Sequence, residues 1–114
     1  MLSMLLLICL KYNMSVTIIK LKLYIIDNDK KGNILLSRDH GGPWQNNKEI
    51  SANMSLNRAM DSAKSSFLED IRSGFQVIHI DPSIDIHKKT NVDEVLERIY
   101  ELYSFCFIQS QRLG

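Results

Sequence analysis

The chain is poor in the residues that mark several common classes of protein. It contains only five glycines and two prolines in 114 positions, and no linker-like stretch rich in glycine, proline or serine. Apolar residues make up 45% of the chain. This composition excludes a disordered tail, a collagen-like chain and a low-complexity linker. At this length the chain holds at most one ordinary domain.

Charge of one sign and clustered cysteines are also lacking. Fourteen Lys and Arg face thirteen Asp and Glu, with no basic block, which gives no support for binding nucleic acid through its phosphates. Cys9 and Cys106 lie too far apart in sequence for a disulfide framework or a zinc motif, so we expect a reducing, cytoplasmic compartment. Nucleotide-binding glycine loops and the Gly-x-Ser-x-Gly nucleophile motif are absent as well.

The N-terminus begins with an apolar run, Met1–Leu10. It is shorter than the about 20 residues that span a bilayer, and it lacks the basic start and cleavage site of a signal peptide. We expect a buried or interfacial helical piece and no membrane span. The following residues, Ser15–Lys31, show both helical and strand-like spacing, so periodicity does not settle their structure. Asp27–Asn33 is a turn by composition.

The middle of the chain reads as a strand, a loop and a helix. Ile34–His40 predicts a strand that is buried in its first half and ends before Gly41-Gly42-Pro43. Trp44–Ser55 is predicted to be a long polar loop. Leu56–Ser73 carries apolar residues at spacings of three and four, which predicts a helix that Gly74 terminates.

A second strand and a second helix follow. Phe75–Asp81 predicts a strand on which Val77, His79 and Asp81 share one face, while Ile78 and Ile80 share the other. After another polar loop, the run from Thr90 to Asp93 fits a capping signature, with Asp93 favouring the start of a helix.

The order strand, helix, strand, helix predicts a parallel sheet with right-handed connections. Ligands of such sheets bind at the carboxyl ends of the strands. Asp39 and His40 end the first predicted strand, and His79 and Asp81 end the second. Because neighbouring strands lie about 4.8 Å apart, these four side chains are predicted to face one site.

These residues resemble a known family. Ser37–Trp44, with the sequence SRDHGGPW, resembles the strand-end motif of a barrel family related to class II sugar-bisphosphate aldolases. Within it, the nearest likeness is to the non-catalytic subunit family of D-tagatose-1,6-bisphosphate aldolase. Ser66–Ser83 is similar to a second segment of that family, in which a helix runs into Gly-Phe and then Ile-His-Ile-Asp. The resemblance covers roughly residues 32–106.

The resemblance implies an α/β fold, the (β/α)8 TIM barrel. Such a barrel needs about 250 residues, and about 200 as a practical minimum. We therefore expect a single partial barrel domain, a strand–helix–strand–helix fragment with parallel strands that is inactive by itself. Its expected parts are an N-terminal apolar and helical segment (1–31), a βαβα unit (32–106) and a tail (107–114). The resemblance also places Ser15–Asp27 in a helix before the first of these strands.

The resemblance further implies metal chemistry. In class II aldolases a zinc ion acts as a Lewis acid on the substrate carbonyl. By position in the motif, His40 would ligate the metal and Asp39 would act as acid and base, with Asp81 near the substrate or a secondary cation. A metal requires a neutral imidazole, and a neighbouring carboxylate has a pKa tuned by that charge.

Two features could serve a sugar phosphate. Gly41 and Gly42 could cradle a phosphate through backbone N–H groups, although two glycines before a proline more often form a simple turn. Arg38 could pair with a phosphate or with Asp39, and the sequence does not choose between them.

Structural interpretations stand beside these roles. Asp39 and His40 could be a strand-end pair in which the carboxylate orients the imidazole. His79 is expected to fill a barrel lumen through hydrogen bonds, and His87 to be solvated. Trp44 could cap a sugar face, but burial of loop surface is the more common use of such a residue.

Three functions remain open from the sequence. The first is a stabilising, non-catalytic subunit that binds sugar phosphate and partners a catalytic aldolase subunit. The second is a metal-dependent lyase or isomerase acting on a phosphosugar. The third is a truncated remnant without activity.

Overall fold

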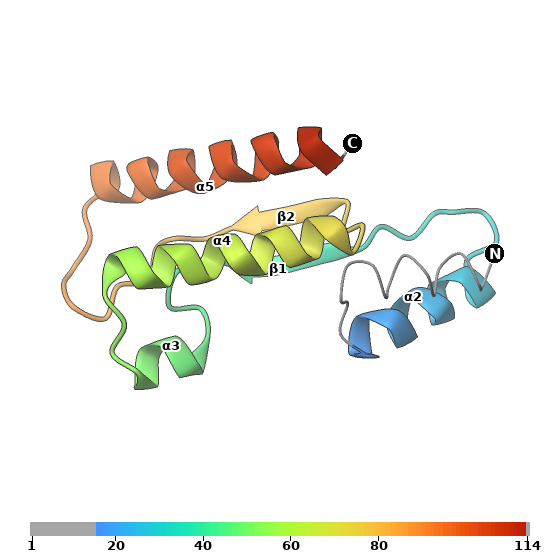
Figure 1. The fold of residues 1–114 in the computed structure, drawn as a ribbon, viewed down its shortest axis with the longest axis horizontal. Coiled ribbons are helices and arrows are strands. Elements are labelled where there is room, and N and C mark those ends of the chain that lie inside the picture. The colour runs from blue at the N-terminus through green and yellow to red at the C-terminus, as the bar shows by residue number, and fades with distance from the viewer. Residues whose placement is uncertain (1–15, 114) are drawn as a thin grey trace.

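The computed structural model describes residues 16–113. The predicted apolar run at residues 1–10 lies outside this range. Two strands and four helices are described, and Figure 1 shows their arrangement. Their order is α2 (Val16–Asn28), β1 (Ser37–Gly41), α3 (Asn47–Ser51), α4 (Leu56–Arg72), β2 (Val77–Ile80) and α5 (Val92–Leu113).

Strands β1 and β2 pair side by side in a parallel sheet, which confirms the predicted mixed α/β character and the predicted parallel pairing. Helix α4 packs against β1 and α5, and α5 packs against β2. Helix α2, expected from the resemblance at nearly these residues, lies beyond the amino ends of both strands (Figure 1). None of the described helices is long and apolar enough to cross a membrane.

The core lies between the helices and one face of the sheet. Met60, Ala63 and Phe67 of α4 join Leu102 of α5 in one buried cluster. The apolar spacing of three and four along α4 places these side chains on a single stripe. Ile78 and Ile80 of β2 pack against the same cluster, as the alternation along the strand predicted.

Two consecutive glycines allow the end of β1 to approach its neighbours closely. A Cβ atom on Gly41 would lie 2.3 Å from Cε1 of Phe67, and one on Gly42 would lie 2.3 Å from the carbonyl oxygen of Asp81. Both distances are far below van der Waals contact. Any side chain here would therefore push β1 away from α4 or from the end of β2.

The segment before α4 is not the plain loop that its polar composition predicted. It contains the short helix α3, capped by Asn46, whose side chain accepts a hydrogen bond from the Lys48 amide at 2.7 Å. Trp44 is fully buried under this segment, and its Nε1 donates to the Met54 carbonyl at 3.1 Å. Trp44 therefore buries loop surface, which was the more common of the two roles considered for it.

Strand β1 begins three residues later than predicted. The amides of Asn33 and Ile34 donate to the Asp29 carboxylate, at 3.0 and 2.7 Å, so they are engaged in a turn. The Leu36 amide donates to the side chain of Gln76 at 2.6 Å, where a sheet would use a backbone carbonyl. Side-chain acceptors thus take these three amides, while the Leu36 carbonyl already accepts from the Gln76 amide at 2.8 Å.

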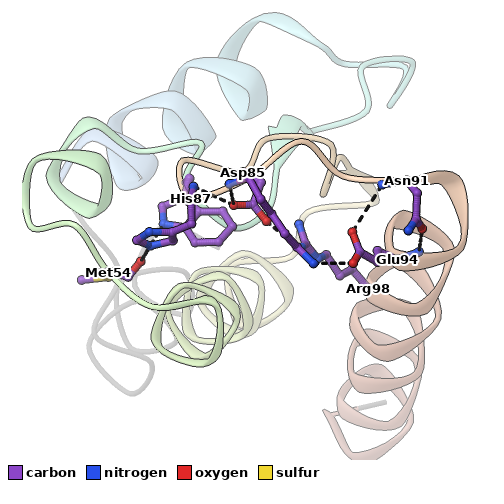
Figure 2. A network of polar contacts seen from close by, with 8 residues as sticks. Met54, Asp85, His87, Asn91, Glu94 and Arg98 are labelled. Carbon is purple, nitrogen blue, oxygen red and sulfur yellow. Dashed lines mark hydrogen bonds and ion pairs between the residues drawn. The ribbon is translucent and has the colours of Figure 1, made fainter.

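A capping box starts α5 where the sequence predicted a helix start, but through a different pair of residues. The Asn91 side chain accepts from the Glu94 amide at 2.9 Å, and the Glu94 carboxylate accepts from the Asn91 amide at 3.3 Å. Figure 2 shows both contacts. Asp93, the residue singled out from the sequence, lies in the first turn beside them.

The loop between β2 and α5 is held by a buried ion pair (Figure 2). Nη2 of Arg98 lies 2.8 Å from Oδ2 of Asp85, and the two side chains are only 6% and 4% exposed. Burial would raise the pKa of Asp85, but the hydrogen bonds from Arg98 and from the amides of His87 and Lys88 hold that pKa below its usual value.

His87 is exposed, as expected, but its ring also makes specific contacts. Its Nε2 lies 2.7 Å from the Met54 carbonyl oxygen, which can only accept, so Nε2 donates (Figure 2). The ring also stands edge-on to Trp44, with centroids 5.6 Å apart. Although its side chain is exposed, His87 links the loop after β2 to the segment before α4.

We expect the substitution R98M to lower the free energy of unfolding by about 3–5 kcal/mol, because it leaves the buried Asp85 carboxylate without its partner. Denaturant unfolding followed by circular dichroism measures the change. R112M, in the exposed last turn of α5, is the matched control and should change stability by less than about 0.5 kcal/mol. Equal effects of the two substitutions would contradict the structural role of the pair.

Candidate functional site

A β-bulge interrupts the sheet at the carboxyl end of β1. Ser37 pairs with Val77 and Arg38 with Ile78, but the next pair joins Gly41 to Ile80. Asp39 and His40 therefore both lie opposite the single residue His79. Bulges insert one extra residue in this way, occur rarely between parallel strands, and redirect side chains near functional sites.

The bulge determines which face His40 occupies. In a regular strand, Asp39 and His40 would point to opposite faces, and His40 would share the helix-facing side with Arg38. His40 instead has a φ of +46°, in the left-handed region that is uncommon for residues other than glycine. Strain of this kind gathers at functional sites. Because of the bulge and this left-handed backbone, Asp39 and His40 lie on the same, exposed face.

Four polar side chains meet on that face, as the sequence predicted. Nδ1 of His40 lies 3.0 Å from Oδ2 of Asp81, and Nδ1 of His79 lies 3.3 Å from Oδ1 of Asp39. Nε2 of His40 is 3.6 Å from the same oxygen of Asp39. The two imidazole rings are tilted against each other, with centroids 4.5 Å apart.

Asp81 is the fixed member of the cluster. Its Oδ1 accepts from the Ser83 hydroxyl at 2.6 Å and from the Ser83 amide at 3.1 Å, so its other oxygen remains available to His40. The hydrogen bonds from Ser83 and then from His40 lower the pKa of Asp81 to about 2. A carboxylate thus holds the Nδ1 side of His40 and leaves Nε2 free to face Asp39.

The same contacts act on His40. The hydrogen bond to Asp81, followed by the nearby charge of Asp39, raises the pKa of His40 above its usual value. The protonated imidazolium is therefore stabilised in the folded chain. This contribution is fully present below the ordinary histidine pKa of about 6.5 and is lost as the pH rises through the higher folded value.

The cluster has the donor set of a divalent metal site. Asp39, His40 and His79 each offer one ligand atom, and these atoms all lie within 4.8 Å of one another. Imidazole nitrogen with carboxylate oxygen suits zinc and related transition metals. The contact between Asp81 and His40 matches the carboxylate that commonly orients a ligating histidine from behind. The side chains are largely exposed, at 83% for Asp39, 57% for His40 and 50% for His79.

Three other residues predicted at the site have packing roles. Arg38 points to the helix side, where its Nη2 donates to Ser66 at 2.7 Å and to Asp70 at 3.1 Å. Its Nε also lies 2.9 Å from Asp70, so Arg38 pairs with Asp70 and not with Asp39. Gly41 and Gly42 are buried, and the close approaches described above account for glycine at both positions, while the phosphate cradle stays a prediction.

Two residues near the site were not assigned a binding role from the sequence. His79 was expected to fill a lumen, yet it is one of three clustered ligand donors. The alternation of side chains along β2 predicted which face of the sheet His79 occupies. Its contacts with Asp39 and His40 depend on the bulge in β1, which the sequence did not predict. Glu49 of α3 is buried although it lies in a segment predicted to be a polar loop, and no sequence pattern signalled that burial.

No family model, curated protein or solved structure matches this chain.

We expect D81N to lower the pKa of His40 towards 6.5, because the neutral amide no longer stabilises the imidazolium. An NMR titration of the imidazole signals measures both values. The substitution D93N, in an exposed residue remote from His40 in the sequence, is the control. An unchanged pKa of His40 in D81N would show that the contact with Asp81 does not form in solution.

Proposed function

We propose that the chain acts in carbohydrate metabolism as a metal-binding βαβα unit of a class II aldolase-like (β/α)8 barrel. The family it resembles is the non-catalytic, stabilising subunit of D-tagatose-1,6-bisphosphate aldolase, with sugar phosphate as ligand and a catalytic aldolase subunit as partner. The observation that carries the proposal is the convergence of Asp39, His40 and His79 at the carboxyl ends of two parallel strands. Ligands of parallel α/β sheets bind at this edge.

In this proposal His40 and His79 hold a divalent metal through ring nitrogens. Asp39 supplies a carboxylate oxygen, either as third ligand or as the acid and base implied by the motif. A bound zinc ion would polarise a substrate carbonyl. Asp81 keeps the Nδ1 proton of His40 in place, so that Nε2 is presented to the metal.

The exposure of the cluster favours a non-catalytic role for the chain acting alone. Asp39 is 83% exposed, so water screens its charge and competes for its oxygens. Closed active sites exclude water, which strengthens every electrostatic interaction within them. Further barrel strands or a partner subunit would supply that enclosure.

A catalytic lyase or isomerase acting on a phosphosugar is the second candidate. The observation that favours it is the number of ligand donors, because catalytic zinc sites usually have three protein ligands and the cluster offers three. The sequence had identified only His40 as a ligand. The two candidates differ in whether zinc produces turnover.

Calorimetric titration with Zn²⁺ tests the site. We expect the wild type to bind one equivalent, H40A and H79A to lose measurable binding, and D81N to bind about 10–100-fold more weakly through loss of the orienting contact. H87Q is the matched control, because His87 is an exposed histidine outside the cluster, and it should bind like the wild type. Wild-type affinity in H40A or H79A would overturn the proposed site.

An assay of D-tagatose 1,6-bisphosphate cleavage separates the two candidates. The zinc-loaded chain should give no turnover alone and should lengthen the half-life of a catalytic class II aldolase subunit when the two are mixed. Turnover that disappears in H40A would establish the lyase. Zinc binding with neither turnover nor an effect on the partner would contradict both functions.

A further inference from the structure

A small polar cavity lies beside the proposed metal ligands. Its volume is about 210 Å³, enough for several water molecules or a small polyol. Asp39 and His40 form part of its wall, so the cavity opens onto the cluster at the strand ends. The remaining wall comes from Arg38, from the segment around α3 and from α4, including Glu49, Ser62 and Ser66.

Glu49 is the residue in the cavity wall that indicates a ligand, because its carboxylate has an acceptor left unpaired within residues 16–113. The residue is only 4% exposed, and its Oε1 has no hydrogen-bond partner among the described residues. A buried acceptor left without a donor costs about 1–3 kcal/mol, and more for a charged group. A ligand that offers hydroxyl protons would remove this penalty.

The charges around the cavity favour a neutral ligand. Its wall carries two carboxylates, Asp39 and Glu49, and two basic groups, Arg38 and His40. Arg38 is already engaged by Asp70 and Ser66, and His40 by Asp81. Because both basic groups already pair with carboxylates, an anionic phosphate would meet the further carboxylates Asp39 and Glu49 with no cation of the described wall reserved for it.

The other polar groups in the wall suit hydroxyls. Ser62 and Ser66 contribute hydroxyl groups that both donate and accept, and Gln45 and Asn46 contribute amides. The Ser66 hydroxyl accepts from Arg38 and so keeps its own proton available to a ligand acceptor. Such a wall matches the alternating donors and acceptors of a polyol chain.

We propose that this cavity binds the hydroxylated carbon chain of a neutral sugar or polyol, with Glu49 accepting hydrogen bonds from its hydroxyl groups. The inference rests on the proposed function in one respect: it assigns the hydroxylated part of a sugar phosphate to this cavity and its phosphate elsewhere. Glu49 is a binding residue, and the metal ligands lie at the mouth of its cavity.

Titration of the full chain with erythritol, followed by ¹H–¹⁵N NMR in the presence of a chelator, tests the inference. We expect saturable shifts of the Glu49, Ser62 and Ser66 amides. E49Q should weaken the affinity about tenfold or more, because hydrogen bonds to a buried charged group contribute about one to two powers of ten in binding. S62A should weaken it several-fold, which keeps the test valid if E49Q fails to fold. E69Q, at an exposed position of α4, is the matched control and should bind like the wild type.

The variants separate this inference from the metal site. H79A should lose zinc but retain erythritol binding, since His79 does not line the cavity, whereas E49Q should bind erythritol more weakly but retain zinc. Unchanged erythritol affinity in both E49Q and S62A would overturn the inference. A titration in which erythritol shifts none of these amides would overturn it too. So would a titration in which the amides respond to an anion (inorganic phosphate) or a cation (ammonium chloride) and not to erythritol.

Discussion

The bulge at Asp39 and His40 is the constraint on which the candidate site depends. One extra residue in β1 places two side chains opposite His79, and the left-handed backbone of His40 moves its imidazole from the helix-facing side to the exposed face. A regular strand would leave His40 against α4 and separate it from Asp81. The strain of this conformation is opposed by the hydrogen bond to Asp81, which Ser83 in turn holds in place.

Contacts between α4 and the helix-facing side of β1 hold the bulge in position. Gly41 follows the bulge directly and lies against Phe67, with no space for a Cβ atom. Before the bulge, Arg38 is bound to Asp70, whose side chain is 7% exposed. Burial raises the pKa of Asp70, while Arg38 opposes that shift. The strand is thus fixed to α4 on both sides of the two residues that face the open side.

Periodicity predicted the parallel pair, the α4 helix and the inward faces of Ile78 and Ile80, because these follow from repeats of two and of three to four residues. The α3 helix, the late start of β1 and the buried Glu49 depend on single side-chain contacts, such as the cap from Asn46 and the contact between Leu36 and Gln76. Such contacts leave no periodic signal. The sequence indicated the four clustered residues through their place at the strand ends, but alternation alone would have put His40 on the wrong face. The (β/α)8 barrel, the zinc ion and the sugar phosphate remain proposals.

The most direct test of this account is the proximity of the two imidazole rings in solution. Their centroids are 4.5 Å apart, so nuclear Overhauser effects should connect the ring protons of His40 and His79. A β1 strand without the bulge would place the His40 ring among α4 side chains such as Phe67. Cross-peaks between His40 and His79 would support the bulged strand end, whereas cross-peaks from His40 to Phe67 without any to His79 would contradict it.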